Sequence, residues 1–261
     1  MLEKIREILL ETPGLKGREL ARKTGLDRKV VNSFLHSHKD LFAQDDDFCW
    51  SMIEPLVLEL ESYWVTADSF EQSLPDTGCL LSGSSPAILV KIPDGCKIML
   101  IAGARLLSLL NQLIYKGKSV TIDLIDCAGT KSFLSRAGFF DLLDERVNVI
   151  PSRPKFPAAK IYRGNSNALV EFGAIDPGQK NKGLVIQLVE RFVQQSSTRF
   201  ETAAFTVFSE LIGNIRDHSE SPIHGFAALQ KYGGSKRHIQ TVVSDSGVGI
   251  CKTLRPSLEE H

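Results

Sequence analysis

The sequence lacks several features that would assign it at once to a chemical class. It has no CxxC pair and no group of Cys and His at metal-ligand spacing, and its five cysteines are scattered. That pattern is typical of reduced thiols in a cytosolic protein. It also has no excess of charge, because 31 acidic residues balance 31 basic ones. Bulk electrostatics therefore favours no partner, and any surface for nucleic acid must be local.

We expect neither a signal peptide nor a membrane span. The N-terminal segment MLEKIREILLE predicts a charged amphipathic helix. The most apolar stretch, residues 97–114, is interrupted by Gly103, Arg105, Asn111 and Gln112, which is unlike a span through a membrane. These observations predict a cytoplasmic protein.

The composition predicts a packed, globular chain. Apolar residues make up 43% and charged residues 24% of the sequence, which are ordinary values for globular domains. At about 100–200 residues per domain, the 261 residues allow one large domain or two to three small ones. Helix and strand patterns alternate in three different blocks, so the expected fold class is α/β, as an α+β multidomain chain.

Residues 1–52 alternate short helical patterns with turns. One helical pattern ends near Pro13, a second ends at Gly25, and a third begins after Asp27, which suits an N-cap. Strand-like residues then lie on both sides of the polar turn at 45–47. The order of three helices and a hairpin predicts a winged helix-turn-helix.

The next two blocks are expected to be a linker and an α/β domain. Residues 53–78 predict a linker with a connecting helix at 56–63 and a loop around Pro75. Residues 79–163 alternate strand and helix patterns, which favours an α/β layer. The expected strands are 87–92, 98–101, 120–125 and 147–150, and the expected helices are 104–115 and 131–143.

The last block, residues 164–261, carries two long helical patterns among strands. The strands are expected at 169–172, 225–230 and 238–244, and the helices at 184–195 and 200–218. In the second helix, Glu210, Asn214 and His218 are spaced at i, i+4 and i+8, so they share one face. The face predicts either the wall of a pocket or a solvated helix surface. In a pocket, the carboxylate could activate water and the amide oxygen could ligate Mg²⁺.

A second motif follows the last expected strand. Asp245, Gly247 and Gly249 form a DxGxG turn. An aspartate there can accept a hydrogen bond from a base amine, and the glycines let the backbone approach a ligand closely. Glycines also serve ordinary turns, but the two motifs in this order are more specific than either one alone.

Together the two motifs resemble the N box and the first glycine box of the GHKL superfamily, which includes gyrase-type ATPases, heat-shock-90 chaperones, histidine kinases and anti-sigma serine kinases. The resemblance covers about residues 166–250 and implies binding of ATP with Mg²⁺. It implies that Glu210 is the catalytic general base, that Asn214 ligates the metal, and that His218 belongs to the same nucleotide pocket.

The same resemblance assigns the adenine side of the pocket. Asp245 would read the adenine base, and Gly247 and Gly249 would shape the pocket around it. The family closes its site with a later lid and a second glycine-rich box, whereas this chain ends at His261. We therefore expect residues 164–261 to form a partial GHKL domain that is inactive or weak as an ATPase, and a longer natural form to be the active one.

The first block carries a local excess of positive charge that favours contact with a phosphate backbone. Within residues 16–29 the basic residues outnumber Glu19 and Asp27; they are Lys16, Arg18, Arg22, Lys23, Arg28 and Lys29. The third helix and the wing are similar to those of Z-DNA- and Z-RNA-binding winged helices. That resemblance implies contacts through the side chains of Arg28, Lys29, Asn32, Ser33, His36 and Trp50. The alternative is a protein-interaction or dimerisation module in which Trp50 closes the small core.

The middle block resembles STAS-type α/β domains over residues 104–143. Arg136 stands where that family has a phosphorylatable Ser, so we expect no phosphoswitch at this position. Arg136 is expected to make a salt bridge or to contact a partner.

These features predict a cytoplasmic regulatory protein that couples an ATP pocket to a nucleic-acid-binding head. The alternatives are a non-catalytic transcriptional regulator and a serine kinase of the anti-sigma kind. Duplex DNA or RNA is the expected partner. The residues leave a protein partner and a homodimer open.

Overall fold

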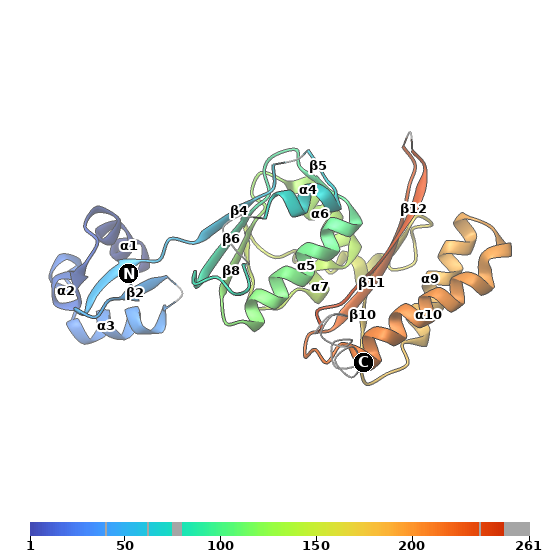
Figure 1. Ribbon diagram of the computed structural model, residues 1–261. Coiled ribbons are helices and arrows are strands. Elements are labelled where there is room, and N and C mark those ends of the chain that lie inside the picture. Colours follow the sequence, from blue (N-terminus) through green and yellow to red (C-terminus); the bar gives the residue numbers. More distant parts are fainter. Residues whose placement is uncertain (40, 62, 75–79, 235, 248–261) are drawn as a thin grey trace.

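The computed structural model is a mixed α/β protein whose helices and sheets alternate in layers (Figure 1). It describes residues 1–39, 41–61, 63–74, 80–234 and 236–247. The small N-terminal unit lies at one end, followed by a middle unit and a C-terminal unit that pack against each other.

The N-terminal unit has the three helices and the hairpin that its sequence predicts, in that order, with a two-residue strand added between the first two helices. Its helices are α1 (Leu2–Glu11), α2 (Gly17–Thr24) and α3 (Arg28–Ser37), and its strands are β1 (Leu15–Lys16), β2 (Phe42–Gln44) and β3 (Cys49–Met52). The strands pair antiparallel in the order β1-β3-β2. Asp27 accepts hydrogen bonds from the N–H groups of Lys29 and Val30, which confirms the predicted N-cap of α3. Ile5, Leu20 and Leu35 pack with Phe42 and Trp50 in a separate small core.

The middle unit is built on a four-stranded parallel sheet of order β4-β6-β8-β9. Its strands are β4 (Leu56–Glu59), β6 (Ala87–Lys91), β8 (Ser119–Asp123) and β9 (Asn148–Ile150), with the short pair β5 (Trp64–Val65) and β7 (Lys97–Ile98) beside it. Its helices are α4 (Ala67–Gln72), α5 (Leu100–Tyr115), α6 (Ala128–Ala137), α7 (Phe139–Leu142) and α8 (Ala158–Tyr162).

The expected helix at 56–63 is wrong, because residues 56–59 form the edge strand β4. Buried Leu58 and Leu60 alternate with exposed Val57 and Glu59, which is the period of a strand with one covered face. β4 pairs in parallel with β6, so the segment expected to be a linker contributes to the middle sheet. The loop expected around Pro75 lies outside the described residues.

Two other boundaries in the middle unit differ from the expectation. The strand expected at 98–101 ends early, since α5 begins at Leu100. The single helix expected at 131–143 is divided into α6 and α7 at Gly138, whose φ is +85°. This left-handed backbone conformation is strained for other residues, so the glycine permits the break between the two helices.

The C-terminal unit is a three-stranded antiparallel sheet with a helical layer on one face. The strands β10 (Leu169–Ile175), β11 (Gly225–Tyr232) and β12 (His238–Ser244) pair in that order, and the helices are α9 (Lys182–Gln195), the short 3₁₀ turn η1 (Thr198–Phe200) and α10 (Glu201–His218). Along β11, Ala227 and Leu229 pack with α9 and α10, whereas Phe226 and Ala228 belong to the core of the middle unit. Successive side chains of β11 point to opposite faces of the sheet, so this one strand contributes to two hydrophobic cores.

Helix α5 lies between the two sheets and is buried on most of its surface. The backbone N–H groups of Leu100 and Ile101, in its first turn, donate to the Tyr232 hydroxyl at 2.8 Å and to the Gln240 Oε1 at 3.1 Å. Side chains of β11 and β12 thus satisfy N–H groups that a helix start leaves unpaired. Among the described residues, no helix is long and apolar enough to cross a membrane.

Candidate nucleotide site

The face of α10 that carries the first motif points away from the sheet. Ala204, Phe208, Ile212 and Ile215 form the buried side of the helix, so the sheet fixes its rotation about its own axis. Glu210, Asn214 and His218 are consequently exposed on the opposite side. The predicted shared face is confirmed.

Glu210 and Asn214 line a cavity of about 440 Å³ between α10 and the start of α9. Val185, Ile186 and Phe205 give the cavity an apolar part. Its remaining polar lining comes from both helices and the loop before α9: Lys180, Lys182, Ser209, Arg216 and Asp217. The pairing of the two helices therefore turns one helix face into a concave site.

The charges around this cavity suit an anionic ligand. The lining carries three cationic side chains, those of Lys180, Lys182 and Arg216, against the two carboxylates of Glu210 and Asp217. The Nε of Arg216 donates to Asp217 at 2.6 Å, and this hydrogen bond holds the pKa of the Asp217 carboxyl below its usual range. Arg216 is thus already paired. Within the described chain, neither lysine forms an ion pair, so both remain available to phosphate oxygens.

The first motif offers its polar groups to a ligand. In the part of the chain that the structure describes, the side chains of Glu210 and Asn214 have no hydrogen-bond partner and no ion pair. No cluster of three His, Cys, Asp or Glu side chains that could hold a metal occurs among the described residues. The chemistry of Asn214 fits one oxygen ligand of Mg²⁺, which ordinarily keeps several waters and takes phosphate oxygens for the rest.

The described part of the second motif, residues 245–247, follows β12, and Gly247 lies against the end of α10. The Oδ1 of Asp245 accepts a hydrogen bond from the Gly247 N–H at 2.9 Å. A Cβ on Gly247 would come within 2.3 Å of the carbonyl oxygen of Ser219. Gly247 is therefore required for this close contact with the residue after His218.

The structure brings some of the predicted site residues together and leaves others apart. The described lining of the cavity contains Glu210 and Asn214 but not His218, Asp245 or Gly247. The two motifs meet at the end of α10 instead, through the contact of Gly247 with Ser219. Gly249 lies outside the described residues.

Two lysines that line the cavity were not predicted from the sequence. Lys180 and Lys182 lie in the segment DPGQKNK, which leads into α9. Their signal was a pair of basic residues at a turn before a long helix. They join the site only because α9 packs along α10.

The predicted nucleic-acid residues divide into an exposed group and a packed group. Arg28, Lys29, Ser33 and His36 are exposed on α3. Asn32 is half-buried and lies against the first turn of α2, where a Cβ on Gly17 would overlap its Oδ1. Trp50 is only 2% exposed, with the ring of His36 edge-on at 4.9 Å between centroids. Trp50 therefore packs in the core of the N-terminal unit and does not belong to the exposed contact surface.

Arg136 forms the salt bridge that was one of the two alternatives for it. Its Nη1 pairs with the carboxylate of Glu171, and its Nη2 donates to the carbonyl oxygen of Tyr162 at 2.8 Å. Glu171 is 3% exposed and belongs to β10. The pair thus ties α6 of the middle unit to the C-terminal sheet.

Comparisons with known proteins add nothing to this geometry. No family model matches the chain, and the searches among curated proteins and among solved structures return no match.

Proposed function

We propose that the C-terminal unit binds ATP with Mg²⁺ in the manner of a GHKL domain and that the chain is a cytoplasmic regulatory protein. One observation carries the proposal: Glu210 and Asn214 line one concave site together with Lys180 and Lys182. The lysines suit the phosphates, and Asn214 suits the metal. The turn at Asp245 lies next to the end of the same helix, which fits a base-binding position.

In this proposal each side chain has a separate task. Glu210 accepts a proton from the attacking water, since an exposed carboxylate without a partner can act as a base. Asn214 holds the metal, and the metal supplies neutralisation of phosphate charge. Asp245 accepts a hydrogen bond from the exocyclic amine of adenine.

Two substitutions test the binding roles by isothermal titration calorimetry. Asp245→Ala is expected to weaken ATP binding about tenfold to a hundredfold, because a hydrogen bond to a charged group contributes roughly 1.5–3 kcal/mol. Asn214→Ala is expected to weaken binding when Mg²⁺ is present and to leave metal-free binding unchanged. Asp46→Ala, in the exposed turn between β2 and β3, serves as a control for loss of an aspartate. Unchanged ATP affinity in both variants would contradict the assignment.

We also propose that the N-terminal unit is a winged helix that binds duplex nucleic acid. The six basic residues of segment 16–29 are all exposed, and Arg28 and Lys29 begin helix α3. Phosphate contacts of this kind do not depend on base sequence. In this proposal, the nucleotide state of the C-terminal unit alters the contacts of this head.

The test of this second role is the salt dependence of binding to a fluorescently labelled duplex, followed by anisotropy. Affinity should fall steeply with added salt, and the Arg28→Ala/Lys29→Ala variant should reduce the slope of log K against log[salt] by about 2, at about 0.9 per lost contact. Arg6→Ala, on α1 outside the basic segment, should leave the slope unchanged. A slope that is the same in all three proteins would exclude α3 as the contact surface.

The alternatives make different predictions for the fate of the γ-phosphate. A radiolabelled-ATP assay that separates free phosphate from phosphoprotein distinguishes an ATPase, a serine kinase and a non-catalytic regulator. The ion pair of Arg136 with Glu171 places a structural side chain where a self-phosphorylating switch would need its serine, and this favours the ATPase over the kinase.

A further inference from the structure

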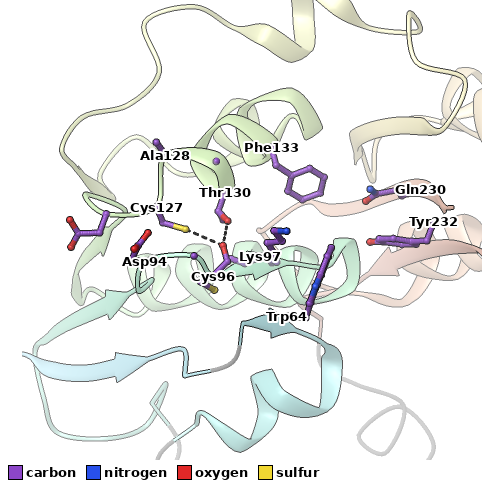
Figure 2. Close-up of a pocket in the computed structure, with 14 residues that line it drawn as sticks. Trp64, Asp94, Cys96, Lys97, Cys127, Ala128, Thr130, Phe133, Gln230 and Tyr232 are labelled. Carbon is purple, nitrogen blue, oxygen red and sulfur yellow. Dashed lines mark hydrogen bonds between the residues drawn. The ribbon is translucent and has the colours of Figure 1, made fainter. Parts of the chain in front are cut away.

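A second cavity, of about 630 Å³, lies between the middle unit and the C-terminal sheet (Figure 2). The middle unit lines it with the segments 94–98 and 126–130, which follow β6 and β8, and with Trp64 and Phe133. The C-terminal unit closes it with Gln230 and Tyr232 of β11. Loops after the carboxyl ends of parallel strands are the place where α/β sheets ordinarily bind small ligands.

Two hydrogen bonds within the protein join the polar residues at the floor of this cavity. The Sγ of Cys127 donates to the carbonyl oxygen of Cys96 at 3.0 Å, and the Thr130 hydroxyl donates to the same oxygen. Both bonds are drawn in Figure 2 and join the loop after β6 to the start of α6. Burial raises the pKa of the Cys96 thiol to about 11, so this thiol stays protonated and neutral. The floor is therefore preformed and carries no thiolate from Cys96.

Aromatic rings and a small excess of negative charge define what the cavity accepts. In Figure 2, Phe133 and Trp64 lie on opposite sides of the space, and Tyr232 closes its end. The Nζ of Lys97 lies 5.2 Å from the centroid of Trp64, which directs its charge toward a ring face. Asp94 and Asp126 outnumber this lysine in the lining. The lining thus favours a planar ring that is neutral or cationic over an anion.

One polar atom in the wall of this cavity lacks a hydrogen-bond partner among the described residues. This atom is the buried Oε1 of Gln230. Its carboxamide points toward Phe133, into the cavity (Figure 2). The Tyr232 hydroxyl two residues later already accepts the Leu100 N–H. A buried acceptor without a partner is uncommon and costly, so turning the carboxamide slightly to accept an N–H from a molecule in this space is favourable.

We propose that this cavity binds a planar aromatic molecule that is neutral or cationic and carries an N–H donor. Its ring lies among Trp64, Phe133 and Tyr232, and its N–H donates to the Oε1 of Gln230. Because Gln230 and Tyr232 belong to the C-terminal sheet and the other lining belongs to the middle unit, the ligand contacts both units and strengthens their packing. This site is separate from the proposed nucleotide site and does not depend on it.

Indole and benzofuran form a matched pair of probes for this site, because they share a shape and only indole donates an N–H. Binding is measured from ¹H–¹⁵N correlation spectra. The chain has two tryptophans, and Trp50 lies in the N-terminal core, so the indole N–H signal of Trp64 should shift while that of Trp50 stays in place. Indole should bind about tenfold more tightly than benzofuran, as expected for one hydrogen bond. Indole-3-acetate should bind severalfold more weakly than indole because of its carboxylate.

Two helical glycines give matched variants that separate the two sites. Gly129 of α6 lines the aromatic cavity and Gly213 of α10 lines the nucleotide cavity, and a Cβ at either position meets nothing within 4 Å. Gly129→Leu should reduce indole binding at least tenfold and leave ATP binding unchanged, whereas Gly213→Leu should do the reverse. Leucine also favours a helix over glycine, so neither helix is weakened.

Gln230→Met removes the hydrogen-bond acceptor and keeps a side chain of similar volume, so it tests the hydrogen bond without creating a cavity. This variant should lower the affinity for indole about tenfold and leave benzofuran unchanged, which abolishes the difference between the probes. The proposal is overturned if indole and benzofuran bind the wild-type chain equally, if neither binds, or if Gly213→Leu rather than Gly129→Leu blocks indole. A failure of ATP binding alone would leave this site untouched.

Discussion

Replacing Glu210 by alanine should lower the rate of ATP hydrolysis at least about a hundredfold and leave the affinity for ATP unchanged or slightly higher. A positioned general base contributes roughly 10²–10⁴ to such a rate. Glu210 is exposed, lines the cavity and has no partner among the described residues, so its removal takes away the base without breaking a structural contact. The small gain in affinity follows from the loss of one negative charge near the phosphates.

The measurement uses single turnovers with protein in excess over radiolabelled ATP, so that the rate of the chemical step is observed directly. Glu210→Gln keeps the shape of the side chain and should lose activity to the same extent, since an amide cannot accept the proton. Glu201→Ala, in the first turn of the same helix, is the matched control and should keep the wild-type rate. Full activity in Glu210→Gln, or equal losses of binding and hydrolysis in Glu210→Ala, would remove the general-base role.

The sequence predicts the C-terminal helices and strands closely because their signals are local. The apolar residues Ala204, Phe208, Ile212 and Ile215 recur at helical spacing through α10. That same period places Glu210 and Asn214 on one face. The strand β12 matches its expected range of 238–244.

The features that escaped prediction depend on contacts between distant segments. β4 was expected to be helical, since its four residues, Leu-Val-Leu-Glu, are too few to separate the helical period from the strand period, and its pairing with β6 is not local. The aromatic cavity gathers Trp64, Phe133 and Gln230 from well-separated segments. No spacing along the chain relates them, and the burial of the Gln230 carboxamide arises only from packing between the two units.

The largest expected effect on stability comes from the ion pair between Arg136 and Glu171. Arg136→Ala should lower the free energy of unfolding by about 3 kcal/mol, because it leaves a buried carboxylate without its partner. The side chains of Arg136 and Glu171 are 25% and 3% exposed, so the guanidinium supplies most of the compensation for the charge of Glu171. For a chain of this size such a loss corresponds to a fall in Tm of roughly 6–10 °C, which differential scanning calorimetry can measure.

Two further variants distinguish the buried charge from a general loss of arginine. Arg146→Ala removes a cation that pairs with Asp144 but is 68% exposed, and exposed pairs contribute at most about 1 kcal/mol, so its Tm should stay close to that of the wild type. The double variant Arg136→Leu/Glu171→Leu should recover most of the loss, because apolar side chains often replace a buried pair at little cost. If the double variant were as unstable as Arg136→Ala, the hydrogen bond to Tyr162, rather than the charge of Glu171, would hold α6 against the C-terminal sheet.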